Sequence, residues 1–479
     1  MVAGLGLLMG GASSSTARVA ALAVPDGVAA GDVGQTSAVL WGRTSAPSTM
    51  HVTVGGRALP QLQVTGATDD AGSVTVRGLQ PGTRYDYEVF FTRGAVRSPT
   101  VSGSFGTAPS PSSGRPVRFV FSGDLGGLGY CRPVDTGGYA IFKPMLALRP
   151  DFFLADGDMI YADDSCPYLA PDGRPNVPGK LPNVAFDVRW TRPSKLLAAY
   201  FAHWRYNRLD PFFQALLRDT PIYSVWDDHE VLNDFGPWPV YPPDPKRTGY
   251  PNVLNAGRQA YLSYAAMRSG PMYRSFRWGR DVELFLLDGR SYRSRNDLRD
   301  TAANAKTLLG PAQLAWLEHG LARSRATWKI VVSDVTLSMG SGEPAARDGF
   351  ANIGGKTGFE RELLGLLSFL DAQNVRNVVF LATDVHYTQF LRHRKDFDGD
   401  GDKLTFRELV TGPLAADRNV PGALDPTTAP VSVFSAGGVA AFAYLHTVVG
   451  RRGLVHLRVD ARTDAGKVLR GSSLDLVPG

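Results

Sequence analysis

The chain has 479 residues, which is too long for one ordinary hydrophobic core and fits two domains, one of them large. Its 43% hydrophobic and 20% charged residues are typical of a globular protein and exclude an intrinsically disordered one. The formal net charge of +6 is small for this length, and no cluster of lysine and arginine indicates a nucleic-acid partner.

Residues 1–23 are predicted to be a signal peptide. Residues 2–10 form an apolar run too short to span a bilayer, and Ala21-Leu22-Ala23 fits a signal-peptidase site. The positively charged segment that normally precedes such a run is missing, so the alternatives are a start codon further upstream or no signal at all. We expect a secreted, extracellular bacterial protein with no transmembrane segment.

Residues 24–108 are predicted to form an all-β sandwich. Short alternating segments are separated by Gly, Pro and Asp at regular intervals, which is typical of small antiparallel sandwiches. The run from Leu79 to Val89 resembles the fibronectin type III pattern, with Tyr85 as its tyrosine corner. We expect a packing or positioning module. Residues 109–116 are rich in Pro, Ser and Gly and are predicted to be a linker.

Residues 117–479 are predicted to form an α/β domain with a largely parallel sheet. Six apolar runs each end in an aspartate and alternate with helical patterns at 139–148, 194–217 (broken near Asp210), 311–323 and 358–373. The aspartates at these strand ends are Asp124, Asp158, Asp227, Asp288, Asp334 and Asp384.

These strand ends predict a metal cluster. Ligand sites of open α/β sheets lie beyond the carboxyl ends of the strands. Several buried carboxylates at one sheet edge would each cost several kcal/mol without cations to hold them.

The two cysteines are predicted to form a disulfide if the protein is exported. Cys131 and Cys166 each follow a strand-end aspartate by a short interval, so their loops emerge side by side if the two strands are neighbours. Two unpaired thiols are the alternative for a cytoplasmic protein.

Four ordered motifs resemble those of the calcineurin-like metallophosphoesterases, most closely the alkaline phosphatase D family, which includes an actinobacterial metal-dependent phospholipase D. The motifs contain Ser122-Gly-Asp124, Gly157-Asp158-Met-Ile-Tyr161, Asp227-Asp228-His229-Glu230 and Asp384-Val-His386. The resemblance implies a β-sandwich followed by a four-layer α/β/β/α catalytic domain, and a binuclear metal centre.

The resemblance assigns Asp124, Asp158, Tyr161 and His386 to a first metal site. Asp158, at a strand tip in the middle of the set, is the natural carboxylate to bridge two cations. Tyr161 is placed like the tyrosine of purple acid phosphatases, and a phenolate favours ferric iron. The alternative for Tyr161 is a loop tyrosine that packs on the surface.

Asp228 and Asp384 are expected to bind the second metal. Carboxylates stand here where relatives often have an amide and an imidazole. This exchange favours calcium, with manganese or magnesium as alternatives, and disfavours zinc. His229 is expected to be catalytic, together with Asp158, and to assist departure of the leaving oxygen. A third metal ligand is the alternative for His229. Asp334 is a candidate ligand or a strand-end cap, and Arg290 and Arg293 are left outside the predicted site.

We therefore expect a hydrolase of phosphate monoesters or diesters in which two metals activate the attacking water. Phospholipase D activity on lipid head groups is the alternative. A non-catalytic surface-binding module ranks below both. The expected partner is a small phosphate ester or a phospholipid, without specific nucleic-acid binding, and a monomer is favoured.

Overall fold

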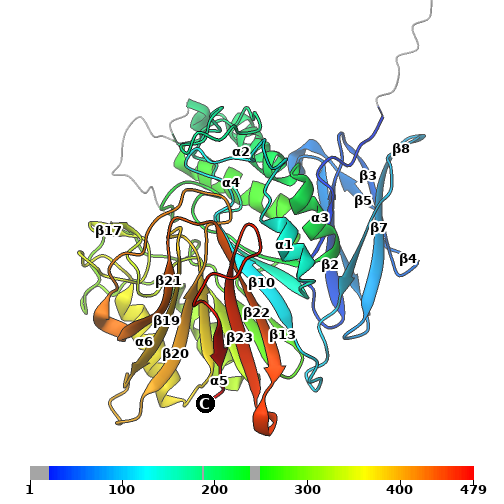
Figure 1. The fold of residues 1–479 in the computed structure, drawn as a ribbon. Coiled ribbons are helices and arrows are strands. Elements are labelled where there is room, and N and C mark those ends of the chain that lie inside the picture. Colours follow the sequence, from blue (N-terminus) through cyan, green and yellow to red (C-terminus); the bar gives the residue numbers. More distant parts are fainter. Residues whose placement is uncertain (1–20, 186–187, 238–248) are drawn as a thin grey trace, which may run out of the picture.

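A computed structural model describes residues 21–185, 188–237 and 249–479. It consists of an amino-terminal β-sandwich beside a larger α/β domain, which confirms the predicted fold class (Figure 1). Most of the predicted signal peptide lies outside the described residues. No helix in the described ranges is long and apolar enough to cross a bilayer.

The sandwich has two antiparallel layers. One layer contains β1 (Val28–Gly31), β2 (Ser37–Arg43) and β6 (Ala71–Arg77). The other contains β3 (Ser48–Val54), β4 (Arg57–Ala58), β5 (Leu62–Val64), β7 (Arg84–Arg93), β8 (Val96–Arg97) and β9 (Val101–Gly106). Strand β3 alternates strictly between buried and half-buried side chains, as expected for a strand with one face on a core. The Tyr85 hydroxyl accepts a hydrogen bond from the Gln80 backbone at 2.9 Å. The likeness to fibronectin type III stays a prediction.

The first sandwich layer continues into the large domain. Strand β1 pairs in parallel with β12 (Ile222–Val225) through Gly31 and Ile222. A side chain at residue 31 would lie 2.2 Å from the Ala266 carbonyl oxygen, so glycine permits this approach. The linker at 109–116 therefore separates two parts of the sequence that share one sheet, which strand patterns did not predict.

The large domain contains two sheets packed face to face. The first joins β10 (Arg118–Ser122), β11 (Phe152–Asp156) and β12 in parallel, followed on the β10 side by β22 (Ala441–Val449), β23 (Val455–Thr463) and β24 (Leu474–Leu476). The second contains, in sheet order, β13 (Arg274–Trp278), β14 (Val282–Leu286), β15 (Trp328–Val332), β18 (Val378–Ala382), β20 (Leu404–Val410), β19 (Thr388–Lys395) and β21 (Pro430–Ala436).

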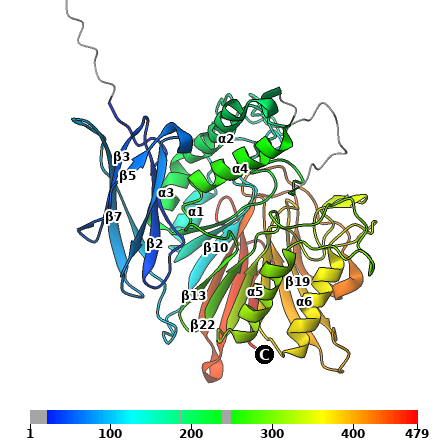
Figure 2. The ribbon, with the colours of Figure 1, turned by 180° about the vertical axis from the view of Figure 1, so that it is seen from behind.

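Helices cover the outer faces of both sheets. The first sheet carries α1 (Phe142–Ala147), α2 (Pro193–Arg208), α3 (Pro211–Asp219) and α4 (Tyr250–Tyr264). The second carries α5 (Gly310–Arg323) and α6 (Glu360–Ala372), which stand in front of it when the molecule is seen from behind (Figure 2). Three hydrophobic cores separate the four layers, and Phe121, Leu154 and Leu284 belong to the one between the sheets.

The predicted break in the second helical pattern is confirmed. Asp210 caps α3, because its carboxylate accepts hydrogen bonds from the backbone of Phe212 at 3.0 Å and Phe213 at 2.9 Å. Helix α4 was not predicted, since its Asn, Gly and Tyr residues give a weak helical signal.

The sulfur atoms of Cys131 and Cys166 are bonded, as expected for an exported protein.

Candidate metal centre

The strand-end aspartates meet at one edge of the two packed sheets. Asp124 and Asp158 follow β10 and β11, while Asp384 follows β18 of the second sheet. All three have positive φ angles, 60°, 52° and 73°, so the chain turns sharply as each strand ends. Gly123 allows this turn, because a side chain there would lie 2.6 Å from the Asp156 carbonyl oxygen.

A first group of potential ligands contains Asp124, Asp158 and His386. One ligand atom of each lies within 4.8 Å of the others, and all three residues are buried. Nε2 of His386 is 3.8 Å from Asp124 Oδ1 and 2.8 Å from the Tyr161 hydroxyl. The structure therefore brings the four residues predicted for the first metal together.

A second group contains Asp158, Asp228 and His229, again with ligand atoms within 4.8 Å. The backbone nitrogen of His229 donates to Asp158 Oδ1 at 3.0 Å. The side-chain Nε2 of His229 lies 3.9 Å from Asp228 Oδ1. Asp158 belongs to both groups, which is the position that a bridging carboxylate requires.

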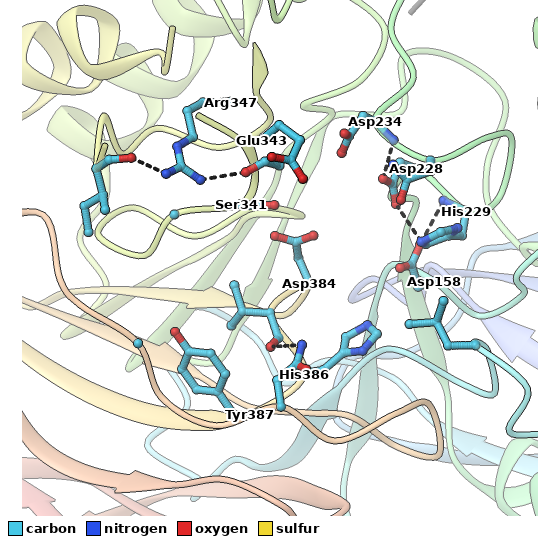
Figure 3. Close-up of a pocket in the computed structure, with 18 of the residues that line it drawn as sticks. Asp158, Asp228, His229, Asp234, Ser341, Glu343, Arg347, Asp384, His386 and Tyr387 are labelled. Atoms are coloured by element: carbon cyan, nitrogen blue, oxygen red, sulfur yellow. Dashed lines mark hydrogen bonds and ion pairs between the residues drawn. The ribbon is translucent and has the colours of Figure 1, made fainter. Parts of the chain in front are cut away.

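Asp384 lies beside these groups without belonging to either of them. Its backbone nitrogen donates to Asp124 Oδ1 at 3.3 Å, and it shares a cavity of about 680 Å³ with Asp158 and Asp228. Figure 3 shows Asp158, Asp228 and His229 together on one side of this cavity, with Asp384 and His386 next to them.

Several carboxylate oxygens here fit cations. Oδ2 of Asp124, Oδ1 of Asp228 and Oδ2 of Asp384 are buried and accept no hydrogen bond from any described residue. Burial raises the pKa of Asp124 to about 6 and that of Asp384 to about 7. A buried carboxylate oxygen that accepts no hydrogen bond is costly, so these oxygens suit bound metal ions.

Two further aspartates contact the Nδ1 atoms of the two imidazoles. Asp163 Oδ1 lies 2.6 Å from Nδ1 of His229, and Asp417 contacts Nδ1 of His386. Burial opposes protonation of His229, but Asp163, Asp228 and Asp158 raise its pKa well above the ordinary value. Sequence reasoning missed both aspartates. Asp163 could have been suspected from its place two residues after Tyr161, whereas Asp417 lies in an irregular loop without a recognisable pattern.

A buried ion-pair cluster supports the centre. Arg290 is fully buried, and its guanidinium lies 2.8 Å from Asp227 Oδ1, 2.6 Å from Asp348 Oδ2 and 3.3 Å from Asp334 Oδ2. Asp334 thus faces a guanidinium, and it is absent from the described groups that could hold a metal. Arg293 also pairs with Asp348, so both arginines that were left outside the predicted site belong to this buried cluster.

The rim of the cavity combines polar and apolar groups. A hairpin of β16 (Gly342–Glu343) and β17 (Ala346–Arg347) forms one wall. Arg347 donates to the Gly342 carbonyl at 2.6 Å and also contacts the Ile353 carbonyl, so it fastens the hairpin (Figure 3). Leu128 and Val420 also line the cavity and are 48% and 73% exposed.

Comparisons with known proteins agree with this architecture. The model of the PhoD-like phosphatase family matches residues 127–463, and that of the PhoD-like phosphatase amino-terminal domain matches residues 10–109. No curated protein sequence matches the chain.

Two solved structures resemble the fold. A structure of PhoD matches with a TM-score of 0.68 and 19% identity, covering 95% of this chain and 94% of its own. The purple acid phosphatase PPD1 of yellow lupin (Lupinus luteus) matches with a TM-score of 0.59 and 13% identity, covering 95% and 75% respectively. The two family models span most of the sequence, and the chain therefore belongs to the PhoD-like phosphatases, which are phosphoester hydrolases.

Proposed function

We propose that this phosphoesterase is a secreted enzyme that hydrolyses phosphate monoesters and diesters with two metal ions. The observation that carries the proposal is that Asp158 belongs to both ligand groups and lines the cavity. Two-metal phosphoesterases place their ions roughly 3.5–4 Å apart across a shared ligand of this kind.

The two groups favour different ions. The first offers an imidazole and the Tyr161 phenol, a combination that suits ferric iron. The second is rich in carboxylate oxygens from Asp158, Asp228 and the neighbouring Asp384, which favours calcium, with manganese, magnesium or zinc as the alternatives.

Different residues would bind the metals and supply the proton. Bound cations would neutralise the charge of the phosphate and increase the acidity of water. Asp124, Asp158, Tyr161 and His386 would hold the first ion, and Asp228 and Asp384 the second. Asp163 fixes Nδ1 of His229 at 2.6 Å, so that Nε2 can donate a proton to the leaving oxygen in the cavity.

A second candidate is phospholipase D activity. The cavity of about 680 Å³ exceeds what one phosphate group fills, and exposed Val420 and Leu128 give its rim apolar surface for a second ester group. Secretion is supported by the disulfide between Cys131 and Cys166, since such bonds persist in oxidising compartments.

The test is hydrolysis of p-nitrophenyl phosphate, bis-p-nitrophenyl phosphate and phosphatidylcholine. Each is offered to the natively purified protein, to the chelated protein and to protein reloaded with single metals or with pairs of metals. We expect turnover that chelator abolishes and that iron together with calcium restores. The preferred ester identifies the substrate class. Failure to hydrolyse any ester under any metal would contradict the proposal.

A further inference from the structure

A second large cavity lies at the opposite edge of the first sheet. It has a volume of about 670 Å³ and is lined by residues at or just before the starts of the parallel strands, among them Arg118, Asp151 and Pro221. Strands β10 and β11 have five residues each, so roughly 17 Å of strand separates this cavity from the metal centre. A single phosphate group cannot contact both.

Four arginines from different segments line this cavity. Arg84 belongs to β7 of the sandwich, Arg115 to the linker, Arg118 to the start of β10, and Arg149 follows α1. All four are exposed. We call this cavity the arginine cleft. It lies at the junction of the two parts of the chain, where binding sites are common.

The aspartates of the arginine cleft are already engaged. Asp151 pairs with the Arg115 guanidinium and accepts the Arg118 backbone N–H at 2.9 Å. Asp219 accepts from the Ser104 hydroxyl at 2.9 Å, and that hydroxyl in turn accepts from Arg84 at 2.5 Å. The two carboxylates thus hold neighbouring side chains in place, and the four arginines outnumber them, so the cleft keeps a surplus of positive charge.

Arg118 and Arg149 are the arginines of the cleft whose guanidinia form no close ion pair, although the charge of Arg118 also acts on Asp151. Among the described residues, no carboxylate forms an ion pair with either guanidinium. Arg149 also has a φ of 48°, a backbone conformation that non-glycine residues rarely adopt and that concentrates at functional sites. Every cation in the wall is an arginine, whose planar fork binds phosphate oxygens in pairs.

We propose that the arginine cleft binds a molecule carrying two or more phosphate groups, at a site separate from the metal centre. Two unpaired guanidinia in a cavity of this size suit several linked phosphates better than one. The phosphates could belong to a free oligophosphate or to a phosphate-rich polymer. In both cases the guanidinium–phosphate contact is the same.

The test measures the Kd of tripolyphosphate by calorimetry on the metal-loaded protein. The variants are Arg118→Gln/Arg149→Gln and a control, Arg325→Gln/Arg361→Gln, which removes equal charge from exposed arginines elsewhere. We expect binding at least about tenfold weaker in the first variant and unchanged in the control. Turnover of p-nitrophenyl phosphate and metal content are expected to stay at wild-type values in both.

A further variant, Asp158→Asn, separates the cleft from the metal centre. We expect its arginine cleft to bind tripolyphosphate as tightly as that of wild type, because the cleft contains none of the proposed metal ligands. Unchanged binding in Arg118→Gln/Arg149→Gln, an equal loss in the control, or binding lost only in Asp158→Asn would each overturn the proposal. Long-chain polyphosphate binding much tighter than tripolyphosphate would identify a polymer as the ligand, and equal affinity a free oligophosphate.

Discussion

The two ligand groups share Asp158, and each adds one further aspartate and one histidine, but their neighbours differ. The first adds a carboxylate, an imidazole and, next to it, the Tyr161 phenol, while the second adds Asp228 and His229, with Asp384 nearby. Each imidazole has its own aspartate behind it, Asp417 or Asp163. We propose different tasks for these two histidines despite their similar surroundings, one as a metal ligand and one as the acid beside the leaving group.

The largest effect is expected when the shared residue is changed. Asp158→Asn removes a charged ligand from both groups, so kcat/KM should fall by more than the roughly 100-fold that changes behind a metal ligand cost. Metal content by mass spectrometry should fall with it. Asp164→Asn, in the same loop but outside both groups, is the matched control and should keep activity and metals. An active Asp158→Asn enzyme would contradict the shared role of Asp158 in the two groups.

His229→Gln tests whether the second imidazole acts on the substrate. A general acid contributes roughly 10²–10⁴-fold, so kcat should fall by that factor while both metals stay bound. The loss should be smaller for p-nitrophenyl esters, whose leaving group needs no proton, than for alkyl esters. If the variant instead loses its second metal, His229 is a ligand and the two imidazoles have the same task.

Asp163→Asn and Asp417→Asn compare the two supporting aspartates directly. Asp163 raises the pKa of His229, so its removal should lower that pKa and move the alkaline limb of the kcat–pH profile to lower pH. Asp417→Asn should instead weaken metal binding by roughly 10–100-fold and leave that limb in place. Identical pH profiles for the two variants would contradict the division of tasks.

Tyr161→Phe should have the smallest effect on turnover, about tenfold, the value of one charged contact. The enzyme is expected to be coloured, because a phenolate bound to ferric iron absorbs visible light, and the variant should lose this absorption. Tyr387→Phe, which removes a hydroxyl at the cavity wall, is the control and should keep the colour. A colourless, iron-free and fully active wild-type enzyme would remove iron from the first group.

The sequence predicted the edge at which the aspartates cluster, because apolar strands that end in aspartates are a local pattern. Asp124, Asp158 and Asp384 each follow such a strand; parallel pairing places the ends of β10 and β11 together, whereas Asp384 comes from β18 of the second sheet. The predicted helix break at Asp210 had an equally local cause. These features depend only on residues that are close in the sequence.

Contacts between distant segments could not be predicted in this way. Asp417 reaches His386 across 31 residues, and Arg290 reaches Asp227 across 63. Sequence reasoning left Arg290 outside the predicted site, since nothing nearby indicates that it becomes fully buried. The pairing of β1 with β12 depends on Gly31 meeting residues far along the chain, and the weak helical pattern of α4 gave no signal.

Crystals of the natively purified enzyme, with anomalous difference maps on both sides of the iron edge, would test the shared role of Asp158 most directly. We predict two peaks roughly 3.5–4 Å apart, both contacting the Asp158 carboxylate, with iron only at the one beside Tyr161 and His386. A single peak, or two peaks of which one does not contact Asp158, would contradict the two-metal account.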